Sequence, residues 1–192
     1  IANHTISASF AVNQFTLTVP PPSNGSVTKN PNQSLYDSNS VVQLTPVANT
    51  GYHFTTWGGD ASGSAVPLSV TMNSNKTITA TFAINTYTLT YTAGANGTIS
   101  GTTPQTVNYG GNGTAVSAVP ATGYHFVNWS DASTANPRTD VNVTANITVT
   151  ANFAINTYTL TYTAGANGTI SGTTPQTVNY GGNGTAVSAV PA

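Results

Sequence analysis

The sequence predicts an all-β fold with little or no helix, arranged as a tandem array of small repeats. The first observation is composition: the 192 residues include 36 Thr, 22 Asn, 17 Ser and 18 Gly, and only 4% are charged. Thr favours pleated strands because its side chain is β-branched, and Asn and Gly favour turns because both tolerate positive φ. The second observation is alternation of apolar residues with Thr, and the third is internal repetition. No stretch shows the 3.6-residue period of an amphipathic helix.

An internal duplication defines repeats of about 71 residues. Residues 82–121 recur without change as residues 153–192, a shift of 71 positions. A diverged copy precedes them, and its Gly-Tyr-His-Phe-x-x-Trp stretch at 51–57 matches the one at 123–129. The chain therefore divides into the last strand of a preceding repeat (1–14), two complete repeats (15–86 and 87–157) and the first half of a further repeat (158–192).

The incomplete repeats at both ends indicate a window cut from a longer tandem array. Residues 3–6 match residues 75–78, which belong to the closing strand of the first complete repeat. In principle this leading segment could complete the half repeat of a neighbouring copy, as a donated strand would. The part equivalent to residues 122–143 would still be missing, so a longer array is the simpler interpretation.

The sequence of each repeat predicts six strands, as the repeat that begins at residue 87 illustrates. Residues 87–91 alternate Tyr, Leu and Tyr with Thr, which is typical of a half-buried strand. The Asn96-Gly97 pair is a strong hairpin signal and should return the chain into a short strand. The predicted strands cover residues 87–91, 98–100, 106–109, 114–119, 124–129 and 146–153.

Aromatic side chains must supply much of the core, because a domain of this size buries only about 60% of its unfolded surface. Each Tyr, Phe or Trp buries about 150–250 Å². Four aromatic positions match between the two complete repeats. The predicted core residues are Tyr52, Phe54, Trp57, Phe82, Tyr124, Phe126, Trp129 and Phe153.

Strict alternation creates a conflict in the aromatic strand. His53 lies between two aromatic residues and should point outward. The same alternation places Trp57 on the face of His53 rather than on the face of Phe54. Either both faces of the strand are partly covered, or a β-bulge shifts the register before Trp57.

The repeat resembles the divergent internalin-B-type repeat, which is related to the Listeria–Bacteroides repeat of large bacterial surface proteins. The Gly-Tyr-His-Phe-Val-Asn-Trp element at 123–129 is its most specific part, and the stretches 96–98 and 147–153 support it. The resemblance covers both complete repeats. It implies small β-grasp-like domains in tandem that act as stalk or spacer regions of secreted or surface-anchored proteins, without catalytic residues.

The charge inventory excludes several classes of protein. Lys29, Lys76 and Arg138 are the only Lys and Arg residues, too few for binding nucleic acid through its phosphates. No apolar run approaches the ~20 residues of a membrane-spanning helix. There is no Cys and no Glu, so disulfides and zinc–thiolate sites are excluded and general acid–base catalysis has few candidates.

We expect no enzyme activity, no cofactor and no metal site. Asp60 and Asp131 each stand alone in a loop, whereas calcium sites commonly use two or more carboxylates. A single Asp favours a turn role, in which its side chain accepts backbone N–H groups. His53 and His125 have no second His, Cys or Glu within a few residues, so they are not typical of a metal site.

Asn-x-Ser/Thr triplets indicate glycosylation sites if the source organism glycosylates its surface. Those in Asn-Gly turns should be the most accessible. A glycan coat would also offset a surface poor in charge. These five residues are Asn24, Asn96, Asn112, Asn167 and Asn183.

Together these patterns predict a structural spacer, stalk or filament-forming region of an extracellular, adhesin-like cell-surface protein. Neighbouring repeats join without a Gly- or Ser-rich linker, which should limit hinge motion. Expected partners are the adjacent repeats, glycans, and further copies in filaments, because the strand edges lack protective Lys and Pro. The alternative is a carbohydrate-binding module with exposed aromatic platforms at Trp57, Trp129, Tyr109 and Tyr180.

Overall fold

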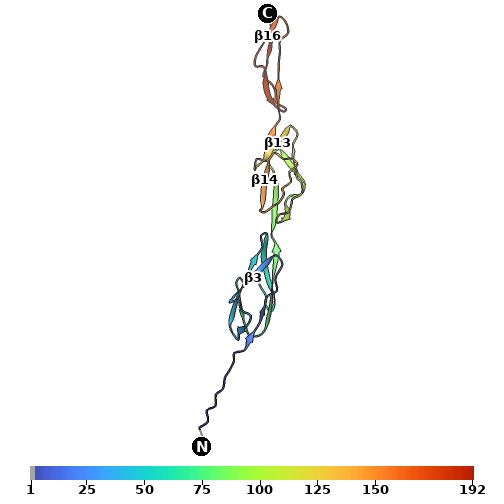
Figure 1. Cartoon of the computed structure of the whole chain (residues 1–192). Coiled ribbons are helices and arrows are strands. Elements are labelled where there is room, and N and C mark those ends of the chain that lie inside the picture. The colour runs from blue at the N-terminus through green and yellow to red at the C-terminus, as the bar shows by residue number, and fades with distance from the viewer. Residues whose placement is uncertain (1–2) are drawn as a thin grey trace. The chain divides into compact units, whose positions relative to one another are not determined.

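A computed structural model describes residues 3–192 (Figure 1). The chain forms two compact units, one ending at Asn85 and the other running from Thr86 to Ala192. The described residues contain no helix, membrane-spanning or otherwise, and about 51% of the chain is strand. The predicted all-β fold is therefore confirmed. Of the expected leading strand 1–14, residues 1 and 2 lie outside the described residues and residues 3–13 form no strand.

The repeat 15–86 consists of small sheets around one long closing strand. β8 (Lys76–Ile84) runs parallel to β2 (Leu17–Thr18) and antiparallel to β6 (Tyr52–Gly59). A second sheet contains β3 (Gly25–Asn30), β5 (Val41–Ala48) and β7 (Leu68–Thr71) in that order. β1 (Gln14–Phe15) pairs with β4 (Tyr36–Asp37).

The repeat 87–157 contains a four-stranded sheet. Its order is β11 (Gln105–Asn108), β9 (Thr86–Ala93), β14 (Ile147–Ile155) and β13 (Tyr124–Trp129). β10 (Gly97–Ser100) and β12 (Ser117–Pro120) form a separate antiparallel pair. β14 is parallel to β9 and antiparallel to β13. The strand that comes last in the repeat is thus an inner strand of its sheet.

The Asn96-Gly97 turn does not form the predicted hairpin. It connects β9 to β10, but β9 pairs with β11 and β10 pairs with β12. Asn96 does adopt the left-handed backbone of such a turn, with φ 68°. Gly97 lies against Phe153, whose ring atoms would be 2.3–2.6 Å from a Cβ at this position. Packing against the core therefore directs the chain into the second strand pair, which a local turn signal cannot reveal.

A β-bulge resolves the conflict in the aromatic strand. The pairing of β6 with β8 shifts register between Phe54 and Thr56. The pairing of β13 with β14 shifts between Phe126 and Asn128. The extra residue brings Phe and Trp onto one face, with ring centroids 4.9 Å apart in the first repeat and 5.7 Å apart in the second. Of the two alternatives, the bulge is confirmed.

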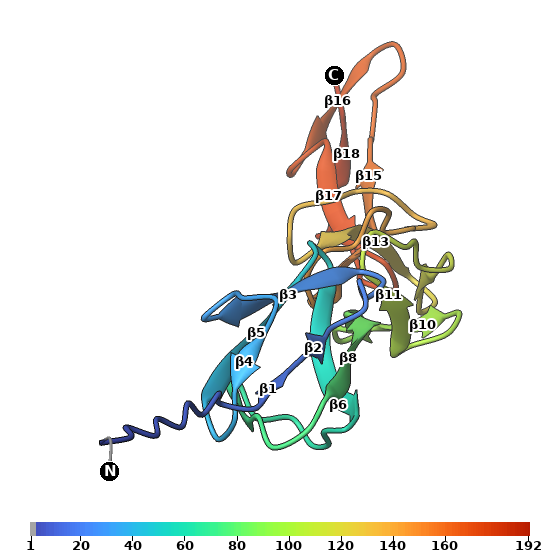
Figure 2. The ribbon, with the colours of Figure 1, turned by 60° about the horizontal axis from the view of Figure 1, so that its bottom comes forward.

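The half repeat 158–192 forms two strand pairs (Figure 2). β15 (Thr157–Leu160) pairs with β17 (Gln176–Asn179), and β16 (Gly168–Ser171) pairs with β18 (Ser188–Pro191). β15 ends at Leu160, although β9, with the same sequence, continues four residues beyond the equivalent Leu89 to Ala93. Among the described strands, none takes the place beside β15 that β14 takes beside β9.

Candidate functional site

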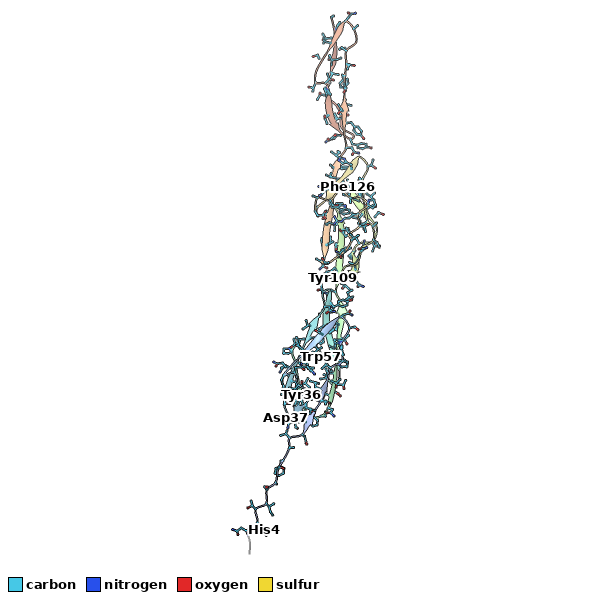
Figure 3. All side chains as sticks on the ribbon, viewed as in Figure 1. His4, Tyr36, Asp37, Trp57, Tyr109 and Phe126 are labelled. Atoms are coloured by element: carbon cyan, nitrogen blue, oxygen red, sulfur yellow. The ribbon has the colours of Figure 1, made fainter. Side chains whose placement is uncertain are left out.

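Each complete repeat has its own hydrophobic core. The first is formed around Trp57 and Tyr36, which Figure 3 labels inside that repeat. The second is formed around Trp129, Leu89 and Tyr91. The two tryptophans are 2% and 0% exposed, so the largest side chain of each repeat is fully enclosed.

The phenylalanines predicted for the core pack in or against these clusters. Phe82 is buried in the first cluster, and Phe54 is partly buried against it. Phe126 and Phe153 are partly buried against the second cluster. Edge-to-face contacts join them, with ring centroids 5.8 Å apart in the first repeat and 6.2 Å apart in the second.

The two predicted core tyrosines are not part of either cluster. Tyr52 and Tyr124 are partly exposed, and the core assignment of both was wrong. Each is the first residue of its strand and pairs with the last residue of the closing strand, Ile84 or Ile155. They therefore lie at the end of the sheet, beyond the enclosed core.

The two tryptophans are structural and cannot act as carbohydrate platforms. Trp57 Nε1 donates to the carbonyl of Ala65 at 2.8 Å, and Trp129 Nε1 donates to the carbonyl of Ala135 at 2.9 Å. A buried indole N–H needs such a partner, and the loop after each aromatic strand supplies it. Because both rings are enclosed, their assignment as exposed platforms was wrong.

The tyrosine platforms differ in their accessibility. Tyr109 is half-buried, and its ring centroid lies 6.4 Å from that of Tyr87. Tyr180 is 47% exposed and lies 6.5 Å from Tyr158, which is 51% exposed. Of the four proposed platforms, Tyr180 is the most exposed.

Arg138 forms a polar cluster that no sequence motif indicated. Its side chain is almost fully buried and donates to Asp131 at 2.7 Å and to Asp140 at 2.7 Å. Tyr91 donates its hydroxyl to Asp140 at 2.7 Å. The guanidinium carbon lies 5.6 Å from the centroid of the Trp129 ring, a cation–π distance. One feature of the sequence could have indicated this cluster: the single Arg of the chain lies close to two Asp residues.

These contacts determine the ionisation of the cluster. Hydrogen bonds from Arg138 lower the pKa of Asp140 against the opposing effect of burial. Burial opposes ionisation of Asp131, but hydrogen bonds from Arg138 and the Ser133 backbone N–H outweigh it and lower its pKa. Burial, followed by the hydrogen bond to Asp140, raises the pKa of Tyr91. At neutral pH the cluster thus holds two carboxylates, one guanidinium and a neutral phenol.

The first repeat fills the same place with apolar side chains. Counting from the equivalent Pro67 and Pro137, Leu68 matches Arg138 and Val70 matches Asp140. Val70 is buried and Leu68 packs against the first core. The fold is therefore compatible with either composition.

Each closing strand is followed by an asparagine that its own repeat holds in place. Asn85 N donates to Gly51 O at 2.8 Å, and Asn156 N donates to Gly123 O at 2.8 Å. His125 Nδ1 lies 2.8 Å from Asn156 Oδ1, and the His53–Asn85 pair has the same distance. The histidines point outward as predicted, but their partner is a residue 31 or 32 positions away, which local spacing could not reveal.

Asn156 also binds the half repeat that follows it. Tyr180 N donates to Asn156 O at 2.8 Å. Gly123 has φ 82°, and a Cβ on it would lie 2.3 Å from a Tyr180 ring atom. Only glycine fits both the backbone and this close approach. Asn156 is thus a one-residue joint with partners on both sides.

The predicted turn role holds for Asp131 but not for Asp60. Asp131 Oδ1 accepts from Ser133 N, two residues further on, in addition to its ion pair with Arg138. Asp60 Oδ2 accepts from Thr77 N, which lies 17 residues further along on β8, so its assignment to a turn was wrong. No three His, Asp or Glu side chains gather as metal ligands among residues 3–192. The side chains predicted to carry glycans are all exposed, at Asn24, Asn96, Asn112, Asn167 and Asn183.

Comparison with known proteins identifies the repeats. The sequence model of the divergent InlB B-repeat domain matches residues 15–86 and 87–157. These two stretches cover most of the 192 residues. No curated protein and no solved structure matches the chain.

Proposed function

Because the chain belongs to the divergent InlB B-repeat domain family, we propose that it is a structural spacer or stalk segment of an extracellular, cell-surface protein. The family is associated with bacterial surface proteins, which supports this location. In this role the chain holds other parts of the protein at a distance.

The joint at Asn156 is the observation that carries the proposal. One residue separates β14 from β15, and its backbone N–H and carbonyl are both hydrogen-bonded, to Gly123 and Tyr180. A flexible linker leaves such groups to water. A spacer keeps its two ends a fixed distance apart only if successive repeats cannot rotate freely about the residue that joins them. The hydrogen bonds of Asn156 restrict that rotation.

The cores support the same role. Their largest side chains are enclosed, and the buried polar cluster of the second repeat is saturated by internal ion pairs and hydrogen bonds. These groups maintain the shape of each repeat. Repeats that differ at this cluster retain the same closing strand and bulge, as expected of units selected for shape.

A distance measurement tests the joint. The chain has no Cys, so Thr148→Cys and Thr177→Cys, both at exposed positions, place spin labels on β14 and β17. Pulsed electron spin resonance should give one narrow distance distribution. Gly123→Ala should broaden it, because the new Cβ collides with Tyr180.

Gly165→Ala is the matched control, because no atom lies within 4 Å of a Cβ at Gly165 and its backbone has no positive φ. A distribution that is already broad in the parent chain, and unchanged by Gly123→Ala, would contradict the spacer role.

We also infer that the exposed Asn-Gly turns carry glycans in a glycosylating host. Asn24, Asn96 and Asn167 have φ between 64° and 68° at the tips of their turns, and each side chain is exposed. Mass spectrometry of protein isolated from its source should then show hexose-containing additions on tryptic or chymotryptic peptides with these residues. Unmodified peptides at all three sites would refute the inference.

A further inference from the structure

We propose that the second repeat carries a binding groove for one or two units of a neutral carbohydrate, and that the same groove recurs in the half repeat. The groove lies along β11 and involves the chain just before and just after this strand. The inference goes beyond the spacer role and does not depend on it.

The groove recurs at an interval of 71 residues. In the second repeat it has a volume of about 320 Å³ and is lined by residues within 102–107 together with Asn112 and Thr114. The equivalent residues, within 173–178 together with Asn183 and Thr185, line a groove of about 300 Å³. Small-molecule sites have volumes of about 300–1,000 Å³, so each groove fits one or two sugar rings rather than a long chain.

A buried amide fixes the groove of the second repeat. Gln105 is only 8% exposed, and its Nε2 donates to the carbonyls of Thr102 and Thr114, both at 2.9 Å. Its Oε1 accepts from Thr114 N at 2.7 Å. Gln176 makes the same three hydrogen bonds in the other copy. The chain before β11 and the chain after it are thus tied to the strand before a ligand arrives, which lowers the entropic cost of binding.

The polar groups of the lining suit a ligand rich in hydroxyl groups. Thr102, Thr106 and Thr114 are exposed, and each hydroxyl can donate one hydrogen bond and accept others. Asn112 Oδ1 accepts from Asn142 N at 2.9 Å, which fixes the side chain and leaves the two N–H donors of its amide for a ligand. A sugar can pair with donors and acceptors of both kinds.

The same lining disfavours other small ligands. All seven lining residues are uncharged, so a phosphate or an acidic sugar would meet no cation in the groove. Pro104 and Val107 supply apolar surface, against which the C–H groups of a sugar ring can pack. A purely apolar ligand would bury the surrounding hydroxyls without partners, which costs free energy.

A peptide strand is the competing ligand, because β11 is an edge strand of its sheet. This edge is only four residues long. Pro104, directly before it, has no N–H with which to extend the pairing. These features favour the sugar, and peptide binding becomes an outcome of the test.

Saturation-transfer difference NMR on the unglycosylated 192-residue chain tests the proposal. The probes are neutral saccharides: glucose, galactose, mannose, fucose, N-acetylglucosamine, N-acetylgalactosamine, lactose and cellobiose. We expect saturable transfer to at least one of them, with a Kd of about 1 mM, because the groove is open and uncharged.

Paired variants locate the binding. Thr106→Val with Thr177→Val removes one lining hydroxyl from each groove, keeps a residue that favours strands, and should weaken binding about three- to tenfold. Thr88→Val with Thr159→Val is the matched control. These two threonines are exposed and pair directly with Thr106 and Thr177, but they do not line the grooves. The control should leave the Kd unchanged.

Two results would overturn the proposal: no transfer to any of the saccharides, or binding that the Thr106 and Thr177 variant leaves intact. If no saccharide binds and a peptide with the sequence of residues 86–93 binds instead, β11 is a site for strand addition and the proposal is wrong. None of these results changes the spin-label distances across Asn156, so the two proposals can fail separately.

Discussion

Arg138 occupies a position in the second repeat that Leu68 occupies in the first. The guanidinium is held by Asp131 and Asp140 and lies over the Trp129 ring. The free energy needed to desolvate a positive and a negative side chain is about as large as the free energy gained from their attraction. A buried ion pair therefore adds little stability compared with well-packed apolar residues. Removing one partner is different, because it leaves a buried charge without compensation.

Arg138→Ala should therefore destabilise the second repeat by about 3–5 kcal/mol. The physical reason is the partly buried Asp140 carboxylate, which would lose its cation. Urea unfolding followed by Trp129 fluorescence measures the effect, in a Trp57→Phe background so that only the second repeat reports.

An apolar replacement of the three most buried members of the cluster is the control for this loss. Tyr91→Val, Arg138→Leu and Asp140→Val together reproduce the residues of the first repeat, Val19, Leu68 and Val70. This triple variant should recover most of the stability lost in Arg138→Ala. If Arg138→Ala costs less than about 1 kcal/mol, as for an exposed pair, the buried-charge argument is wrong.

The same cluster predicts a difference in acid stability between the repeats. The folded-state pKa values of Asp131 and Asp140 lie below their ordinary value. Their contribution is therefore fully present above the unfolded pKa of about 3.9 and is lost as the pH falls through the folded values. The second repeat should lose stability from pH 5 downward, more than the first repeat, where Leu68 and Val70 replace the pair.

Single-tryptophan variants measure this difference. Trp57→Phe reports the second repeat and Trp129→Phe reports the first, so urea midpoints at pH 7 and pH 3 can be compared within one chain. Midpoints that fall equally in the two variants would show that the Arg138 cluster does not set the acid response.

At the scale of elements, the bulge in β13 predicts that this strand tolerates the deletion of one residue. Deleting one residue from a strand normally turns every later side chain to the other face. Here Phe126 pairs with Phe153 and Asn128 with Asn152, so Val127 is the extra residue. Deletion of Val127 should leave a regular ladder with Trp129 still inside.

Fluorescence distinguishes the outcomes of this deletion. In the Trp57→Phe background, Trp129 emission should remain blue-shifted, as for an enclosed indole. Deletion of Val149 from β14, where the ladder has no bulge, is the contrasting variant and should unfold the repeat. A red-shifted emission after Val127 deletion would mean that the bulge is required for the core.

The neighbour of a strand also decides whether an identical sequence forms a strand at all. Amides of 90–93 lie on β9 beside β14, whereas the identical 161–164 follow the end of β15. Hydrogen exchange on the isolated 192-residue chain should therefore show slow exchange at 90–93 and fast exchange at 161–164. Equal protection of the two segments would contradict a dependence on the closing strand.

Sequence patterns predicted the elements better than their connections. All six strands predicted for the second repeat are present. Period-2 alternation indicated those at 87–91, 114–119 and 146–153, because side-chain direction is a local property, and turn residues or aromatic content indicated the others. The Asn96-Gly97 turn suggested the wrong partner, since packing of Gly97 against Phe153 decides where the chain goes next. The His125–Asn156 pair and the Tyr91–Asp140 hydrogen bond join residues that are 31 and 49 positions apart, so their proximity exists only in the folded chain.

At the scale of the whole molecule, the interpretation of the chain as a series of equivalent repeats rests on its internal duplication and on its family membership. The duplication indicated units of equal shape, and the family match covers the two complete ones. What repetition could not predict is how one unit joins the next. That depends on Gly123, whose missing side chain leaves room for Tyr180, and on an asparagine bonded to both neighbours.

The inner position of β14 has a consequence for how a repeat is made. Thr92 and Thr150, which face each other across β9 and β14, are 58 residues apart in the chain. During synthesis, or during passage through a translocation pore with the amino end leading, β9 emerges long before its partner. A repeat therefore cannot complete its sheet until its final residues arrive, and we expect the repeats to fold one after another in chain order.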